Sequence, residues 1–187
     1  MDFKKYFNEF SEMVAHDQDI EDKLSNLTSL FLQTHEKGNK IIFVGNGGSA
    51  AMASHVSVDL TKNAKIRAIN FNEADLITCL SNDRGYENWI VEALKMYADP
   101  GDVIVLVSSS GRSPNIANAA TWASQPKNDV TLVTVTGMSS NNPTKAINKD
   151  GINLWVDSKA YNLIEMTHHF WLLAIVDKII GNAVYSA

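Results

Sequence analysis

Two mostly apolar stretches of the chain each run directly into a loop that is rich in glycine or serine. Residues 40–44 (KIIFV) lead into GNGGSA at 45–50, and residues 103–107 (VIVLV) lead into SSSGRS at 108–113. Such apolar runs are typical of parallel strands buried on both faces, and parallel strands need long crossover connections, which are usually helices. The chain is therefore predicted to form an α/β sandwich in which helices cover both faces of a parallel sheet.

The rest of the sequence continues this alternation of strands and helices. Further strands are predicted at residues 66–70, 130–135 and 152–156, which gives a three-layer α/β/α sandwich with a five-stranded sheet. Helices are predicted at residues 49–62, 114–124 and 162–180, and residues 138–151 are expected to form a loop with one short helical turn. The prediction is one domain, 1–187, made of a helical arm (1–37) and an α/β core (38–187).

Composition and charge exclude several classes of partner. Acidic residues outnumber basic residues by 21 to 16, so the chain lacks the basic surface that nucleic-acid binding needs. The longest strongly apolar stretch, residues 170–176, is too short to cross a bilayer, and the first residues contain no apolar signal segment. We expect a soluble cytoplasmic protein without nucleic-acid or membrane partners. The single cysteine, Cys79, is expected to be buried and unreactive.

The two loops predict an anion site at the carboxyl ends of the strands, where open parallel sheets bind their ligands. Glycine lets the backbone approach a ligand closely, and a helix that begins after the loop offers unpaired N–H groups to an anion. Serine hydroxyls add further donors. The simpler alternative is that glycine and serine only form tight turns. Neither loop has the Walker A lysine or the dinucleotide-binding glycine spacing, so a monophosphate is favoured over a nucleotide.

Four motifs together make the chain resemble the sugar isomerase (SIS) domain family, and within it the sedoheptulose 7-phosphate isomerases. They are GNGGSAAMASH at 45–55, SNDRGYE at 81–87, PGDVIVLVSSSGRSPN at 100–115 and TLVTVTG at 131–137. The resemblance implies a flavodoxin-like fold with a five-stranded parallel sheet, and assembly as a homotetramer. It also implies conversion of sedoheptulose 7-phosphate to D-glycero-D-manno-heptose 7-phosphate through an enediol, for the synthesis of cell-envelope polysaccharides.

The same resemblance assigns residues of both loops to a phosphorylated sugar. The implied substrate-binding residues are Asn46, Gly47, Gly48, Ser49, Asp83, Ser108, Ser109, Ser110 and Ser113. The serines of the second loop would hold the phosphate, while Asn46, Ser49 and Asp83 would contact the sugar or form the pocket wall. Arg112 stands where relatives often have asparagine, and it could either face the phosphate or point into solvent.

An aldose–ketose isomerisation needs a base near C1 and C2 and an acid for the oxygens. His55 and Asp59 are four residues apart, so a helix places both on one face. In the isomerases that the chain resembles, a glutamate at the position of Asp59 is the base, so Asp59 is the predicted base, with His168 or His169 as the acid. His55 and Asp59 are also the candidate ligands of a zinc ion, which many relatives bind.

Two further positions depart from those isomerases. Alignment on Glu165 places Ile164 and Leu172 where the relatives have glutamine and histidine. Neither apolar side chain can bind a metal or transfer a proton, and the nearby histidines could equally be structural. Two alternatives to a heptose isomerase therefore stay open. One is a non-catalytic SIS protein that binds phosphosugars or acts as an adaptor, and the other is an isomerase of a different phosphosugar.

Overall fold

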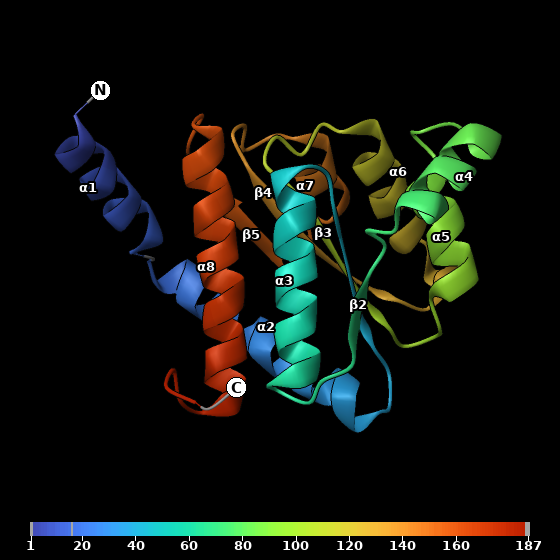
Figure 1. Cartoon of the computed structure of the whole chain (residues 1–187), viewed down its shortest axis with the longest axis horizontal. Helices are drawn as coiled ribbons and strands as arrows, with labels where there is room; N and C mark the ends of the chain where they lie inside the picture. Colours follow the sequence, from blue (N-terminus) through green and yellow to red (C-terminus); the bar gives the residue numbers. More distant parts are fainter. Residues whose placement is uncertain (1, 16, 186–187) are drawn as a thin grey trace.

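The computed structural model describes residues 2–15 and 17–185, and a parallel sheet of five strands lies at its centre (Figure 1). The strands are β1 (Ile41–Gly45), β2 (Ala68–Asn70), β3 (Val103–Ser108), β4 (Thr131–Gly137) and β5 (Asn153–Val156). They lie in the order β2-β1-β3-β4-β5, and every neighbouring pair is parallel. The strand order reverses between β1 and β3, which is the point where open parallel sheets bind their ligands.

Helices cover both faces of the sheet and complete the predicted three-layer fold, which is confirmed. The helices are α1 (Phe3–Val14), α2 (Gln18–Glu36), α3 (Gly48–Lys62), α4 (Ala74–Arg84), α5 (Trp89–Tyr97), α6 (Pro114–Ala123), α7 (Pro143–Ile147) and α8 (Tyr161–Ile180), with a 3-10 turn at Pro126–Asn128. The short turn predicted within residues 138–151 is α7. Among the described residues, no helix is long and apolar enough to cross a membrane.

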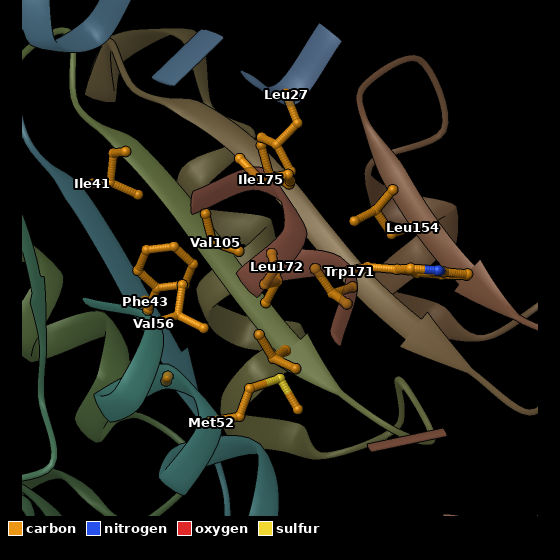
Figure 2. Close-up of a cluster of buried hydrophobic side chains, with 14 of the residues drawn as sticks. Leu27, Ile41, Phe43, Met52, Val56, Val105, Leu154, Trp171, Leu172 and Ile175 are labelled. Carbon is orange, nitrogen blue, oxygen red and sulfur yellow. The ribbon is translucent and has the colours of Figure 1, made fainter. Parts of the chain in front are cut away.

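Strands β1 to β4 each contribute to two separate hydrophobic cores, because successive side chains of a strand point to opposite faces. Phe43 of β1 and Val105 of β3 pack with Leu172 of α8 on the face that α2, α3 and α8 cover (Figure 2). Ile42 and Ile104, from the same two strands, belong to the other core, which α5 and α6 cover. Burial on both faces explains why these strands are continuous apolar runs rather than alternating patterns.

The predicted helical arm consists of two helices with different roles. α2 belongs to the sandwich, since Leu27 and Phe31 are buried in the core beneath it. α1 projects from the sandwich (Figure 1), and none of its described residues is buried. Its Phe3 and Phe7 side chains are 69% and 62% exposed. The boundary predicted at residue 37 therefore falls inside the packed unit.

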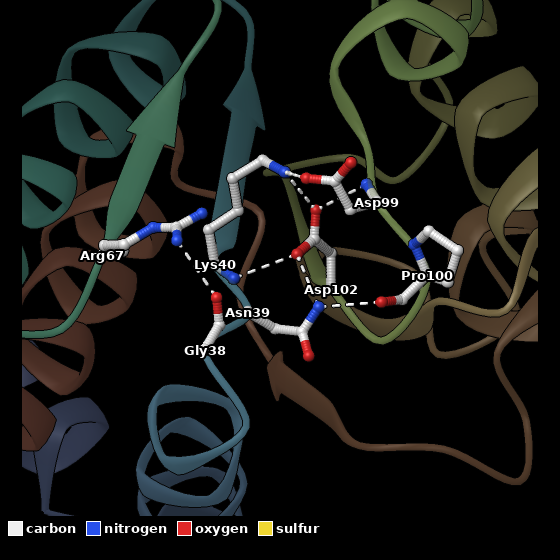
Figure 3. Close-up of polar contacts among 7 residues, drawn as sticks. All are labelled: Gly38, Asn39, Lys40, Arg67, Asp99, Pro100 and Asp102. Atoms are coloured by element: carbon white, nitrogen blue, oxygen red, sulfur yellow. Dashed lines mark hydrogen bonds and ion pairs between the residues drawn. The ribbon is translucent and has the colours of Figure 1, made fainter.

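A buried ion pair joins β1 to β3 at their amino ends, opposite the two loops (Figure 3). Lys40 Nζ lies 2.6 Å from Asp102 Oδ2 and 2.5 Å from Asp99 Oδ2, and Asp102 is fully buried. Asp102 also accepts the backbone N–H groups of Lys40 and Asp99, at 2.9 and 2.8 Å. Burial alone would lower the pKa of Lys40, but hydrogen bonds to Asp102 and Asp99 and their charges raise it overall.

The exposure of Cys79 contradicts the burial predicted for it. It lies on α4 and is exposed, and Leu80 is the one residue of this helix that is buried. The prediction depended on apolar neighbours in the sequence, but those neighbours do not form a continuous stripe along the helix that faces the sheet.

Candidate functional site

A pocket opens at the carboxyl ends of β1 and β3, where the strand order reverses. Its volume is about 160 Å³, and its lining residues are Asn46, Ser49, Val107, Ser108, Ser109, Ser110, Ser113, Tyr161 and Glu165. They come from the loop after β1, the start of α3, the end of β3 and the loop that follows it, and the first turns of α8. The topology thus brings both predicted loops into one site, with Asn46, Ser49 and the four predicted serines in its wall.

The serine loop is held by hydrogen bonds from its own backbone. The N–H of Gly111 donates to the carbonyl oxygen and to Oγ of Ser108, at 3.1 Å each. The N–H of Arg112 donates to Ser110 Oγ at 3.3 Å. Ser113 occupies the cap position of α6, but its hydroxyl makes no cap hydrogen bond, so it stays available to a ligand. Hydroxyls and a helix N-terminus therefore meet at one side of the pocket.

Two glycines shape the connection from β1 to α3. Gly47 has a φ of 54°, in the left-handed region that is costly for other residues. Gly48 begins α3 against the carboxylate of Glu165, and a β-carbon at this position would displace that carboxylate. Neither glycine lines the pocket. Gly47 sets the path of the backbone beside the pocket, and Gly48 leaves room for the carboxylate of Glu165.

Glu165 is the carboxylate in the wall of this pocket, and the sequence patterns did not identify it as a site residue. It lies on the second turn of α8, and its Oε1 accepts the hydroxyl of Ser109 at 3.3 Å. In the sequence, Glu165 served only as an alignment anchor. One signal could have identified it: it is a carboxylate in the first turns of a helix that follows a parallel strand, at the sheet edge that already holds both loops.

Asn46 is held by residues from two other segments. Its amide exchanges two hydrogen bonds with the amide of Asn115, at 3.0 and 2.9 Å, and its oxygen also accepts the hydroxyl of Tyr86 at 3.2 Å. Tyr86 comes from the SNDRGYE motif, in which Asp83 is the predicted sugar contact. Asp83 is instead exposed on α4, where it accepts the side-chain N–H of Asn82, and it lies outside the pocket lining.

Three titratable side chains lie in contact on α3 and α8, with His55 between Asp59 and His169. His55 Nε2 lies 3.3 Å from Asp59 Oδ2, and His55 Nδ1 lies 2.9 Å from His169 Nε2. Burial and the charge of His55 lower the pKa of His169, although Asp59 opposes this shift. His169 follows Glu165 by four residues, about 6 Å along the helix. The predicted base and one predicted acid therefore lie together, outside the lining of the serine pocket.

This donor set does not fit the predicted zinc site at His55 and Asp59. Both ring nitrogens of His55 already face protein partners, Asp59 and His169. Within residues 2–15 and 17–185, no three His, Cys, Asp or Glu side chains are placed to hold a metal ion. Ile164 and Leu172 are buried in the core. A zinc site normally needs at least three protein ligands in tetrahedral geometry.

His168 is a core residue, which argues against the acid role predicted for it. The ring is fully buried, and its Nε2 lies 2.9 Å from the carbonyl oxygen of Thr136 on β4. Burial lowers the pKa of His168 to about 4, against the opposing effect of the Thr136 carbonyl. The ring is therefore neutral near pH 7 and donates its N–H to β4. Its contacts tie α8 to the sheet and leave it out of the pocket wall.

The burial of a neutral His168 predicts that acid destabilises the protein. The ring takes up a proton near pH 6.5 in the unfolded chain but only near pH 4 in the folded protein, so protons favour unfolding between these values. The free energy of unfolding is expected to fall by about 2 kcal/mol between about pH 7.5 and about pH 5 from this residue alone. Urea unfolding of the wild type and of His168→Gln measures this contribution. An identical pH dependence in the two proteins would contradict the prediction.

Comparison with protein families and curated sequences gives two findings. The family model described as SIS domain matches residues 5–137. The phosphoheptose isomerase of Pelobacter propionicus is 31% identical over 114 residues, which cover 58% of this chain and 59% of the relative. The chain therefore spans less than two thirds of the length of that relative.

Solved structures match over nearly the whole chain. A phosphoheptose isomerase from Francisella tularensis superposes with a TM-score of 0.84 at 22% identity, covering 96% of each chain. Phosphoheptose isomerase from Neisseria gonorrhoeae gives a TM-score of 0.81 at 25% identity, covering 94% of this chain and 97% of the other. The fold described above is therefore the fold of these proteins.

Proposed function

The chain belongs to the SIS-domain family, and on that premise we propose that it isomerises sedoheptulose 7-phosphate to D-glycero-D-manno-heptose 7-phosphate. The observation that carries the proposal is the single pocket that holds the serine loop, Asn46 and Glu165 together. It combines hydroxyl and amide donors for a phosphate with a carboxylate for proton transfer. The similarity in sequence and fold to phosphoheptose isomerases supports the choice of substrate.

The phosphate of the substrate is assigned to Ser108, Ser110 and Ser113 of the serine loop, because the hydroxyl of Ser109 donates to Glu165. Serine hydroxyls donate to its oxygens, and the N-termini of α3 and α6 both meet the pocket, where their dipoles favour negative charge. Arg112 is exposed and lies outside the pocket lining. In this proposal the phosphate is therefore held by neutral donors rather than by an arginine.

The carbon-bound proton is assigned to Glu165. A base removes a proton from C1 of the ketose, and the resulting enediol takes the proton back at C2, while a second proton moves from O1 to O2. Glu165 can carry the carbon-bound proton in both directions. His169 lies one helical turn beyond Glu165, outside the pocket lining, and is hydrogen-bonded to His55, which pairs with Asp59. It is assigned to the proton on the oxygens. Asp59, the base predicted from sequence, is then a partner of His55.

We further propose that the protein is a cytoplasmic homotetramer whose product supplies the synthesis of cell-envelope polysaccharides. Exposed apolar side chains on two helices support the assembly: Phe3 and Phe7 on α1, and Tyr161, Met166 and Phe170 on α8. Clusters of this kind are typical of protein–protein interfaces. Because Tyr161 also lines the pocket, assembly through α8 would place the site close to a subunit boundary.

Hydrogen exchange followed by NMR in heavy water tests the proposed activity. With sedoheptulose 7-phosphate, the wild type is expected to incorporate deuterium next to the carbonyl and to form the aldose, and with pentose and hexose phosphates it is expected to react more slowly. The variant Ser110→Ala/Ser113→Ala is expected to raise KM by about 10-fold or more, because two phosphate donors are lost. Ser124→Ala, at the far end of α6, is the matched control.

Two outcomes would contradict the proposed activity. Calorimetric binding of sugar phosphates without hydrogen exchange in any of them would favour the non-catalytic binding protein. Conversion of a pentose or hexose phosphate alone would favour an isomerase of a different phosphosugar.

A further inference from the structure

The orientation of one amide in the pocket wall is fixed by hydrogen bonds that begin at the backbone. The N–H of Ile116, in the first turn of α6, donates to Asn115 Oδ1 at 3.0 Å. A backbone N–H can only donate, so the atom that it meets must be the oxygen of the Asn115 amide. The two ends of an asparagine amide are otherwise distinguished only by their partners. The backbone N–H of Ile116 therefore fixes the orientation of the Asn115 amide.

The same reasoning extends from Asn115 to Asn46. Asn115 Nδ2 donates to Asn46 Oδ1 at 2.9 Å, and Asn46 Nδ2 donates back to Asn115 Oδ1 at 3.0 Å. The hydroxyl of Tyr86 donates to the second lone pair of Asn46 Oδ1, at 3.2 Å. The oxygen of Asn46 is then fully used, and one of its two N–H groups remains. Asn46 can therefore offer a ligand a donor and no acceptor.

We propose that Asn115 is a positioning residue that makes Asn46 a pure hydrogen-bond donor toward the phosphate or another acceptor oxygen of the ligand. The inference rests on the proposed function, because that function supplies the phosphorylated ligand. Asn115 is 1% exposed and does not line the pocket, so it acts through Asn46. If Asn46 were flipped, its oxygen would face the phosphate oxygens and repel them. The pairing with Asn115 excludes that orientation.

Tyr86 has a weaker part in the same network. Its side chain is more than half exposed, and its hydroxyl reaches Asn46 from the connection between α4 and α5. When this hydroxyl is removed, both hydrogen bonds between Asn46 and Asn115 remain, so the amide keeps its orientation. The network therefore predicts that loss of Asn115 weakens ligand binding strongly and that loss of the Tyr86 hydroxyl weakens it only slightly.

Binding and kinetic measurements on matched variants test whether loss of Asn115 weakens binding more than loss of the Tyr86 hydroxyl. Asn115→Leu keeps the branching and the number of heavy atoms of the side chain. It removes both hydrogen bonds to Asn46 and the one from the N–H of Ile116. It is expected to raise the Kd for inorganic phosphate and the KM for the sugar phosphate by about 10-fold or more, while kcat changes less than about 3-fold. Tyr86→Phe is expected to change each constant by less than about 3-fold. Asn118→Leu is the control, because Asn118 lies exposed on the same helix and bonds to the carbonyl of Glu87.

The measurements separate failure of the inference from failure of the proposed function. If the wild type binds phosphate and Asn115→Leu binds it equally well, the inference alone is overturned. If the wild type binds neither phosphate nor sugar phosphate, both are overturned. If Asn115→Leu does not fold, NMR of the wild type still tests the inference. On addition of phosphate, one of the two side-chain N–H proton resonances of Asn46 is expected to shift much more than the other, and equal shifts or none would contradict the inference.

Discussion

Replacing Glu165 with glutamine is expected to lower kcat for the isomerisation by about a thousand-fold, with little change in KM, because an amide cannot accept a proton from carbon. Glutamine has nearly the same size, and its Oε1 can still accept the hydroxyl of Ser109, so the pocket keeps its shape. Steady-state kinetics and deuterium exchange measure the loss. Calorimetry with the sugar phosphate checks that binding is retained.

Asp59→Asn provides a matched exchange of carboxylate for amide on the neighbouring helix. Asp59 lies outside the pocket lining and contacts His55, so its loss is expected to lower kcat by about 10-fold rather than a thousand-fold. Both variants are expected to unfold at the same urea concentration as the wild type. Full activity in Glu165→Gln together with an inactive Asp59→Asn would reverse the assignment and support Asp59 as the base.

Removing the amine of Lys40 is expected to lower the free energy of unfolding by about 3 kcal/mol. The Lys40→Met variant keeps the apolar stem but leaves the buried carboxylate of Asp102 without its cation, and broken buried ion pairs typically cost about 3–5 kcal/mol. The lower value is expected because two backbone N–H groups still donate to this carboxylate. Urea unfolding near pH 7 measures the change.

An exposed ion pair on α5 gives the control for Lys40→Met. Lys95 pairs with Glu92 at 2.7 Å, and Lys95→Met is expected to cost less than about 1 kcal/mol, because solvent screens the pair. Adding Asp102→Asn to Lys40→Met is expected to recover part of the loss, since it removes the uncompensated charge. A Lys40→Met variant that is as stable as the Lys95→Met variant would show that the buried pair contributes nothing.

The sheet could be predicted because its strands carry their own signal. β1 and β3 are buried on both faces, so their residues are apolar without alternation, and the loops after them are punctuated by glycine and serine. α4 was not predicted, because Leu80 is its one buried residue and the helix therefore has almost no apolar periodicity. α1 and α2 were predicted as one arm, since apolar spacing alone does not reveal which helix packs against the sheet.

The candidate site could be predicted only where its residues follow strands directly. Asn46, Ser49 and the serines lie in the two loops that follow strands, whereas Glu165 lines the pocket from α8. Asn115 and Tyr86 lie outside the lining and contact Asn46 from other segments of the chain. α8 is apolar on nearly every side, so its sequence did not distinguish the histidine in the core from the histidine beside His55. The direction in which α8 packs makes that distinction.

The residues that stabilise the fold and the residues that form the pocket lie at opposite ends of β1 and β3. The Lys40–Asp102 pair joins their amino ends, while both pocket loops leave their carboxyl ends. A strand of this length separates the two by about 17 Å, beyond the distance at which substitutions usually interact energetically. Mutations in the loops are therefore expected to combine additively with mutations at the pair. Substitutions in the loops can therefore change the sugar specificity without altering the contribution of the Lys40–Asp102 pair to the stability of the fold.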